Sequence, residues 1–174
     1  MRSAIKAVRR IFGEREIVGA EVGVFEGRNA KDMLDNLPNL KKLYLIDPYE
    51  QYEGWMTDGW YDKILQAKEV ALKTLEPYNE RIRWVMKKTE DGIGDIEPNS
   101  LDFIYIDGNH TYEYVKKDLE IASIWVKHRG IIGGHDFAPG KRGVIKAVLE
   151  FCKERNITFS IRGRDWWFEK KWKT

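Results

Sequence analysis

Acids and glycines stand where the apolar runs of this sequence end, and these side chains could bind a ligand. Glu21, Gly23 and Gly27 close the first run, and Asp47 closes the second, twenty residues after Gly27. Two glycines spaced by four let the backbone turn tightly and approach a ligand at the start of the next helix. An acid at that distance is expected to accept hydrogen bonds from two ribose hydroxyls. The pattern predicts a site for an adenosine-containing cofactor; alternatively, the glycines serve packing and Asp47 caps a turn.

The glycine spacing also separates two classes of cofactor. The dinucleotide fingerprint G-x-G-x-x-G has a third glycine in the loop, which this sequence lacks. A carboxylate in front of the loop, Glu21, disfavours a diphosphate and favours a cationic or zwitterionic ligand. We therefore expect a positively charged nucleoside rather than a dinucleotide.

Apolar periodicity predicts the elements that would position these side chains, because strand-like runs alternate with runs at helical spacing. The expected strands span 17–24, 42–46, 82–86, 101–106, 130–133, 157–161 and 166–172, and the expected helices span 3–12, 30–37, 64–75, 115–126 and 144–151. This alternation is typical of a doubly wound α/β fold, here with a mostly parallel seven-stranded sheet and a C-terminal antiparallel hairpin. Ligands bind to such sheets beyond the carboxyl ends of the strands.

No repeat, low-complexity tract or linker divides the sequence, so we expect a single domain over 1–174, with an N-terminal helix within 1–14. The segment 49–62 is rich in aromatic residues and glycine. It could be a lid over an acceptor or a packed loop. The helix that contains Val115 is expected to end just before Gly130, which would make His128 a cation at a helix terminus.

Composition excludes several classes of function. The 30 basic and 28 acidic side chains nearly balance, so the whole molecule offers no electrostatic attraction to nucleic acid or membranes. No apolar run is long enough to span a membrane, and the first ten residues lack a signal-peptide core. Cys152 is the single cysteine, which favours a reducing compartment. We expect a cytoplasmic protein that acts on a small-molecule acceptor.

Two stretches resemble a known family. The run E-V-G-V-F-E-G over 21–27 resembles the first motif of class I S-adenosylmethionine (SAM)-dependent methyltransferases, and Asp47 resembles their second. The run IDGNHTYEYVKKDLE, which starts at Ile106, and the later GGHDF resemble the macrocin O-methyltransferase-like and cephalosporin hydroxylase-like branch. That branch is related to the metal-dependent catechol-type O-methyltransferases. The resemblance covers about residues 17–140 and implies a Rossmann-like methyltransferase sheet.

The resemblance implies SAM as the cofactor. Its amino-acid part would be held by Glu21, Gly23, Gly27 and Asn29. Asp47 would bind the ribose, and Thr89 and Glu90 would contact the adenine. Asp107, at the end of the fourth strand, would lie nearest the methyl group.

The resemblance also implies a divalent metal site and a general base. The positions that match the family's metal ligands are Asp107, His135 and Asp136. Relatives carry an acid or an acid/amide pair where this chain has His135-Asp136. Mg²⁺ prefers oxygen ligands whereas imidazole suits Mn, Fe or Zn better, so this departure leaves open which metal binds, Mg²⁺ or Mn²⁺ first among them, and whether one binds at all. His110 matches a histidine that takes the proton of the acceptor hydroxyl, and imidazole titrates near neutral pH; alternatively, it only holds a loop.

The expected function is therefore O-methylation of a small-molecule hydroxyl, on a sugar or a catechol-like ring, with SAM and with Mg²⁺ or Mn²⁺ as an optional aid. One alternative is a cofactor-binding module or partner subunit without chemistry of its own. A second is a nucleotide-dependent oxidoreductase on the same fold, which Glu21 and the missing glycine disfavour. The chain could also form a homo-oligomer.

Overall fold

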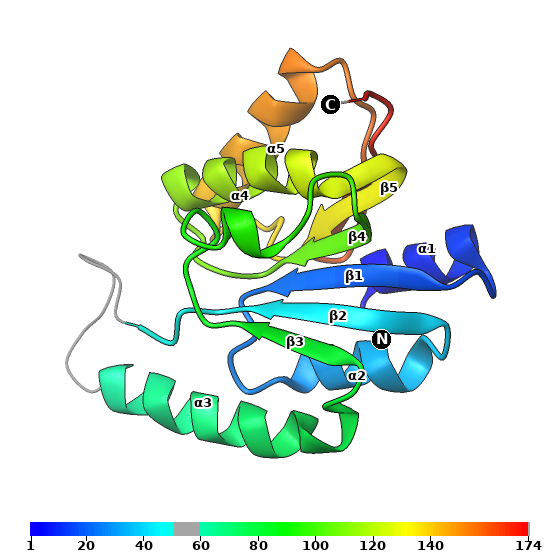
Figure 1. Ribbon diagram of the computed structural model, residues 1–174. Helices are drawn as coiled ribbons and strands as arrows, with labels where there is room; N and C mark the ends of the chain where they lie inside the picture. The colour runs from blue at the N-terminus through cyan, green and yellow to red at the C-terminus, as the bar shows by residue number, and fades with distance from the viewer. Residues whose placement is uncertain (51–59, 174) are drawn as a thin grey trace.

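The computed structural model describes residues 1–50 and 60–173, which form one seven-stranded sheet with helices on both faces (Figure 1). The strands are β1 (Ile17–Val22), β2 (Leu40–Ile46), β3 (Ile82–Val85), β4 (Leu101–Ile106), β5 (Val126–Gly134), β6 (Ser160–Arg162) and β7 (Asp165–Glu169). The α-helices are α1 (Ser3–Phe12), α2 (Arg28–Asn36), α3 (Trp60–Leu75), α4 (Tyr112–Trp125) and α5 (Arg142–Glu154). Two short 3₁₀ helices, η1 (Glu76–Tyr78) and η2 (Ile93–Asp95), lie in the connections.

The strand order is β3-β2-β1-β4-β5-β7-β6. Neighbouring strands from β3 to β5 are parallel, and β7 runs antiparallel to both β5 and β6. This confirms the predicted doubly wound sheet with its closing hairpin. The arrowheads of β1 to β4 point to the same side in Figure 1, so the residues that follow these strands meet at one edge of the sheet.

Each face of the sheet has its own apolar core, which explains the periodicity of the helices. Leu119 and Trp125 of α4 and Val148 of α5 are fully buried in the core on one face. On the other face, α1, α2 and α3 bury side chains such as Val8 and Met33. Burial of these helical stripes on both faces is the main favourable contribution to the fold.

Several predicted boundaries differ from the structure by a few residues, as for β6, β7 and the start of α3, and the prediction for the end of α4 is wrong. Helix α4 ends at Trp125 rather than just before Gly130, and β5 begins at once with Val126. His128 is therefore an exposed residue of β5 and not a cation at a helix terminus. The amides of Asn99 and Ser100 donate hydrogen bonds to the carbonyls of the last α4 turn, at 2.9 Å each. These bonds draw the end of α4 to the start of β4, where Val126 pairs with Leu101.

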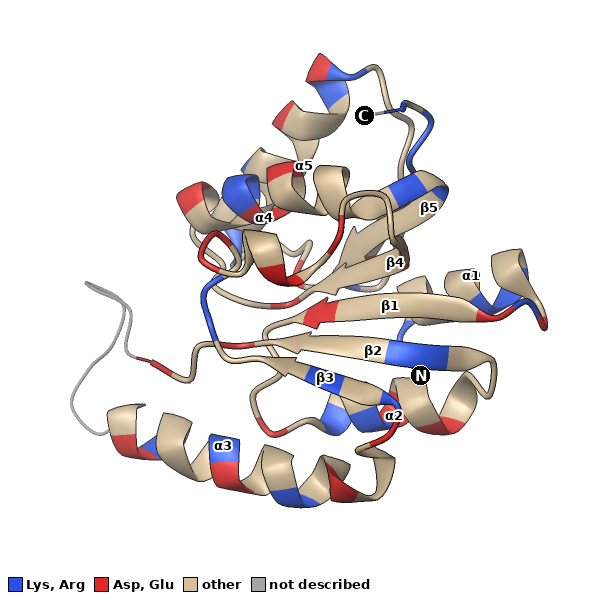
Figure 2. Cartoon of the chain, viewed as in Figure 1, with Lys and Arg blue, Asp and Glu red and all other residues tan. Residues whose placement is uncertain are grey.

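The structure shows how the charged and apolar residues are distributed over the helices. Figure 2 shows Lys and Arg mixed with Asp and Glu along α3, without a one-signed surface there. Within the described parts of the chain, no helix has the length and apolar character that crossing a membrane requires.

Helix α1 is fixed to the sheet by a buried acid. Asp165, at the start of β7, accepts hydrogen bonds from the Ala4 amide at 2.9 Å and from the Tyr105 hydroxyl at 3.0 Å. Its side chain thus joins α1, β4 and β7. Because all three groups are buried, removing the carboxylate leaves two donors without an acceptor.

We expect Asp165→Ala to lower the free energy of unfolding by about 2–4 kcal/mol, since unsatisfied buried donors are costly. Urea denaturation followed by circular dichroism measures this as a lower midpoint at an unchanged slope. Asp91→Ala is the control, because Asp91 is exposed, and it should change the free energy by less than about 0.5 kcal/mol. Equal midpoints for the two variants would contradict the structural role of Asp165.

Candidate functional site

A cavity of about 450 Å³ opens beyond the carboxyl ends of β1, β2 and β4. This size is within the usual range for small-molecule sites. The predicted site residues that line it are Glu21, Gly23, Asn29, Asp47, Thr89, Glu90, Asp107 and His110. Gly27, His135 and Asp136 are not among its lining residues. The predicted cofactor residues other than Gly27 therefore share one cavity with the predicted base.

Glu21 forms a buried acidic wall of this cavity. It is the fifth residue of β1, only 1% exposed, and its Oε1 accepts a hydrogen bond from Asn29 Nδ2 at 2.7 Å. Its Oε2 has no hydrogen-bond partner among the described residues. Burial raises the pKa of Glu21 to about 8, opposed by the Asn29 hydrogen bond and reinforced by the negative charges of Asp107 and Asp47. A buried carboxyl with an unused oxygen is suited to a cationic ligand group.

The two glycines fix the backbone of the loop after β1. Gly23 has φ +84°, and an added Cβ would lie 2.3 Å from the carbonyl oxygen of Asp107. Gly27 has φ +76° at the N-cap of α2, and an added Cβ would lie 2.9 Å from Leu75 Cδ1. Both positions therefore require glycine. The close approach at Gly23 is to the backbone after β4, which brings Asp107 next to the loop.

Asp47 holds this loop in place. Its Oδ2 accepts hydrogen bonds from the amides of Val24 at 2.9 Å and Phe25 at 3.0 Å, and its Oδ1 accepts one from the amide of Tyr49 at 2.9 Å. Burial raises the pKa of Asp47 above its usual value, although these three amides oppose the shift. Each carboxylate oxygen can accept more than one hydrogen bond. The predicted contact with ribose therefore remains compatible with the loop contacts.

The far end of the cavity is formed after β3 and by α4. Thr89 is buried, and Glu90 lies 3.1 Å from the ammonium of Lys117. Asp118 of α4 also lines the cavity, and its burial raises its pKa to about 7, against a hydrogen bond with Thr89 that lowers it. This end therefore offers several polar atoms to a flat heterocycle.

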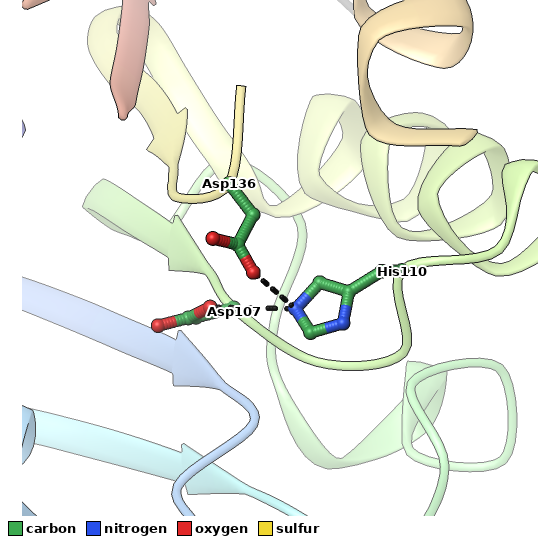
Figure 3. Close-up of side chains that lie close together, drawn as sticks. All are labelled: Asp107, His110 and Asp136. Carbon is green, nitrogen blue, oxygen red and sulfur yellow. Dashed lines mark ion pairs between the residues drawn. The ribbon is translucent and has the colours of Figure 1, made fainter. Parts of the chain in front are cut away.

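Asp107, His110 and Asp136 meet beside the cavity (Figure 3). Asp107 follows β4, His110 lies in the loop after it, and Asp136 follows the neighbouring β5. Nε2 of His110 is 3.0 Å from Asp136 Oδ2 and 3.7 Å from Asp107 Oδ1. One ligand atom from each residue lies within 4.8 Å of the others, a spacing that could hold a metal ion.

Cationic and imidazole groups surround these carboxylates. Nδ1 of His135 is 3.1 Å from Asp136 Oδ1 and 3.7 Å from Asp107 Oδ1, so the predicted ligand His135 lies next to the three-residue group without being a member of it. Arg164 Nη1 and Lys141 Nζ each lie 3.7 Å from Asp136. Burial raises the pKa of Asp107, but the two nearby histidines and the charge of Arg2 outweigh burial, and the pKa lies below its usual value.

Lys141 also defines the proton position on His110. Its ammonium lies 2.9 Å from His110 Nδ1. An ammonium can only donate, so Nδ1 accepts the bond and the proton of the neutral ring lies on Nε2, which faces Asp136. In this tautomer Nε2 can neither accept a proton nor bind a cation; it can do so in the other neutral tautomer, with the proton on Nδ1 and Lys141 turned away from it.

Comparisons with known proteins agree with this geometry. A family model described as a methyltransferase domain matches residues 20–137, which include the glycine loop, Asp107 and Asp136. The chain belongs to this methyltransferase family. No curated protein sequence gives a significant match.

Solved structures support the same fold for the methyltransferase. The O-methyltransferase NovP is similar with a TM-score of 0.71 and 14% identity, over 97% of this chain and 79% of NovP. TomG from Streptomyces achromogenes, an O-methyltransferase solved with SAM, gives a TM-score of 0.67 and 12% identity, over 96% and 77% of the two chains. CalS11, a TDP-rhamnose 3′-O-methyltransferase, gives 0.63 and 17% over 95% and 77%. The predicted resemblance to class I SAM-dependent methyltransferases is thus confirmed, and the oxidoreductase alternative is disfavoured.

Sequence reasoning missed three side chains at the methyltransferase site. Arg2 lines the cavity and lies 3.6 Å from Asp107, Asp118 lies at the far end, and Lys141 contacts His110. A carboxylate on the apolar face of a predicted helix was the available signal for Asp118, since such residues are rarely buried without a partner. The predicted lid over 49–62 falls mainly on 51–59, which lie outside the described residues. At its start, the buried Tyr49 donates a hydrogen bond to the Phe25 carbonyl at 2.9 Å.

Proposed function

We propose that this SAM-dependent methyltransferase transfers the methyl group to a hydroxyl of a small molecule, on a sugar or a catechol-like ring. The observation that carries the proposal is the group of Asp107, His110 and Asp136 directly beside the cofactor cavity. An oxygen acceptor needs a group that removes its proton, and this group combines an imidazole with two carboxylates. That CalS11 is named as acting on a sugar hydroxyl adds support for the acceptor class.

The cavity would act mainly by alignment. Glu21 would hold the amino-acid part of the cofactor and Asp47 its ribose. The sulfonium between these two parts would then lie near Asp107. When bound, SAM would supply an activated methyl group: the acceptor oxygen would bond to the methyl carbon as the carbon–sulfur bond breaks with its electron pair going to sulfur, which gives S-adenosylhomocysteine (SAH). His110 would take the proton released by the hydroxyl on Nε2, in the tautomer that carries its own proton on Nδ1 and from which Lys141 has turned away. Fixing this in-line geometry lowers the entropic part of the barrier.

The residues present also fit a divalent metal. Asp107, His110 and Asp136 would hold it, with His135 adjacent to both carboxylates. Two carboxylates with imidazole nitrogen form a mixed donor set, which favours Mn²⁺ over Mg²⁺. When bound, the ion would lower the pKa of the acceptor hydroxyl. The neighbouring Lys141 and Arg164 already balance part of the carboxylate charge, so we expect metal affinity to be modest.

The test uses purified protein with methyl-labelled SAM and two acceptor panels, catechols and nucleotide sugars. Each panel is run with EDTA, with Mg²⁺ and with Mn²⁺. Transfer of label to an oxygen of at least one acceptor is expected, with Mn²⁺ giving the highest rate. Tight SAH binding in calorimetry without transfer to any acceptor would instead favour a cofactor-binding module.

We expect Asp47→Ala to weaken SAH binding by roughly 10- to 100-fold, because it removes an acceptor for ribose hydroxyls and releases the loop amides. Isothermal calorimetry measures this effect. Glu16→Ala is the control, since its exposed carboxylate pairs with Lys41 at the surface and neither residue lines the cavity, and its SAH affinity should be unchanged. Wild-type affinity for Asp47→Ala would rule out the ribose contact.

A further inference from the structure

Arg2 brings a positive charge to the wall of the cavity that otherwise carries acids. It is the N-cap residue of α1 and lines the cavity, with Nη2 3.6 Å from Asp107 Oδ2. Its side chain is 37% exposed, so the guanidinium can reach both Asp107 and the cavity interior. Its charge also acts on the buried Glu21, where it lowers the pKa against the effect of burial.

The packing of α1 against the sheet fixes the backbone at Arg2. The Ala4 amide bonds to the buried Asp165 at 2.9 Å, and Ile5 and Val8 are each 1% exposed. The start of α1 is thereby fixed against the sheet, while the Arg2 side chain extends over the end of β4. A guanidinium on a fixed backbone loses less conformational freedom when it binds a ligand.

The charges at this end of the cavity are complementary to an amino acid in its zwitterionic form. Glu21 Oε2 and Asp107 offer carboxylate oxygens to an ammonium group. The carboxylate of the same ligand then needs a cation. Of the other cavity-lining cations, Arg28 is 84% exposed and pairs with Glu26 at 2.7 Å, while Lys87 and Lys88 follow β3 at the opposite end.

We propose that Arg2 binds the carboxylate of the cofactor's amino-acid part, and that it makes the enzyme selective for cofactors that carry this carboxylate. The planar guanidinium matches a carboxylate through two parallel hydrogen bonds, which a lysine cannot reproduce. Turning toward the ligand would also release Asp107 from its 3.6 Å contact with Arg2. The proposal rests on SAM as the cofactor.

The experiment compares two ligands that differ only in this group: SAH and its decarboxylated analogue, in which an aminopropyl chain replaces the amino-acid chain. Calorimetry gives the dissociation constants for wild type, Arg2→Gln and Arg2→Lys. We expect Arg2→Gln to weaken SAH binding by roughly 10- to 100-fold and to change binding of the analogue by less than about 3-fold. Arg2→Lys should restore part of the lost SAH affinity.

Arg28→Gln is the matched control, because it removes a charge from the same cavity rim and should keep the wild-type ratio of the two constants. If Arg2→Gln weakens binding of SAH and of the analogue equally, or weakens neither, the ratio of the two dissociation constants is unchanged. Either result would overturn the proposal, and equal weakening would show a merely structural role for Arg2. If wild type binds neither ligand, the proposed function itself fails. If wild type binds SAH and only the ratio is insensitive to Arg2, the proposed function stands and this inference alone is rejected.

Discussion

Replacing Glu21 by glutamine should weaken SAH binding by roughly 10- to 100-fold while leaving the fold intact. The variant keeps the shape of the side chain and its contact with Asn29. It removes the negative charge from a group that is 1% exposed, where a charge-assisted hydrogen bond to an ammonium is strongest. Calorimetry with SAH measures the loss, which follows from the usual strength of such bonds.

The raised pKa of Glu21 gives this prediction a second readout. Because the pKa in the free protein is about 8, the carboxyl is mostly protonated at pH 6.5. Binding of the cofactor's ammonium requires the ionised form, so binding should release close to one proton. The calorimetric enthalpy of wild type should therefore depend on the ionisation enthalpy of the buffer, and that of Glu21→Gln should not. SAH affinity of wild type should rise with pH between 6 and about 8.

The raised pKa of Glu21 should make the stability of the free protein fall with rising pH, whereas SAH affinity rises. A carboxyl whose pKa is raised on folding binds its proton more tightly in the folded state, from its usual 4.5 up to about 8. Its contribution to the stability of the free protein therefore falls as pH rises through that window. Glu21→Gln should remove this loss and melt higher than wild type at pH 8.5. Lower affinity with higher stability cannot come from misfolding.

Glu16→Gln is the control for these measurements, because Glu16 directly precedes β1, is 71% exposed, pairs with Lys41 and does not line the cavity. It should bind SAH as wild type does and keep the buffer dependence. If Glu21→Gln binds SAH as tightly as wild type, Glu21 does not contact the cofactor. If the binding enthalpy of wild type does not depend on the buffer, Glu21 is already ionised in the free protein.

The parts of the site that the sequence predicts are those that follow from sheet topology. Residues at the carboxyl ends of neighbouring parallel strands must meet, so Glu21, Asp47 and Asp107 surround one cavity. The same rule brings Asp136 to Asp107, since β4 and β5 are neighbours. No side-chain detail is needed for these placements, only the order of strands and helices.

The parts that the sequence does not predict depend on how elements pack. Arg2 reaches the cavity because Asp165, which lies more than 160 residues away in sequence, fixes the start of α1. Lys141 contacts His110 because of the path of the loop before α5, and no sequence motif marks that path. The sequence places the end of α4 too far along the chain for two reasons. Val126 continues the helical spacing of the apolar residues before it, and no glycine or proline separates helix from strand. Strand pairing, which is not local, decides that boundary.

Replacing His110 by alanine should lower kcat by roughly 10²- to 10⁴-fold, the usual contribution of a general base, and change SAH affinity by less than about 2-fold. The imidazole lies among Asp107, Asp136 and Lys141, away from the end of the cavity that Thr89 and Asp118 form. His128→Ala is the control, because this exposed histidine of β5 should leave turnover unchanged. Wild-type turnover in His110→Ala would exclude His110 from the mechanism.

Two further measurements on His110→Ala separate a base from a metal ligand. Because Lys141 lies at Nδ1, either role needs the other neutral tautomer, in which the ring proton is on Nδ1 and Lys141 has turned away. The two roles differ in what the free Nε2 then takes up, a metal ion or the proton of the acceptor. If His110 binds a metal, its loss should weaken Mn²⁺ binding in calorimetry by at least 10-fold, as expected when one of three ligands is removed. If it acts only as the base, Mn²⁺ affinity should stay constant, and the kcat of His110→Ala should rise with pH where wild type has levelled off, because hydroxide replaces the missing imidazole.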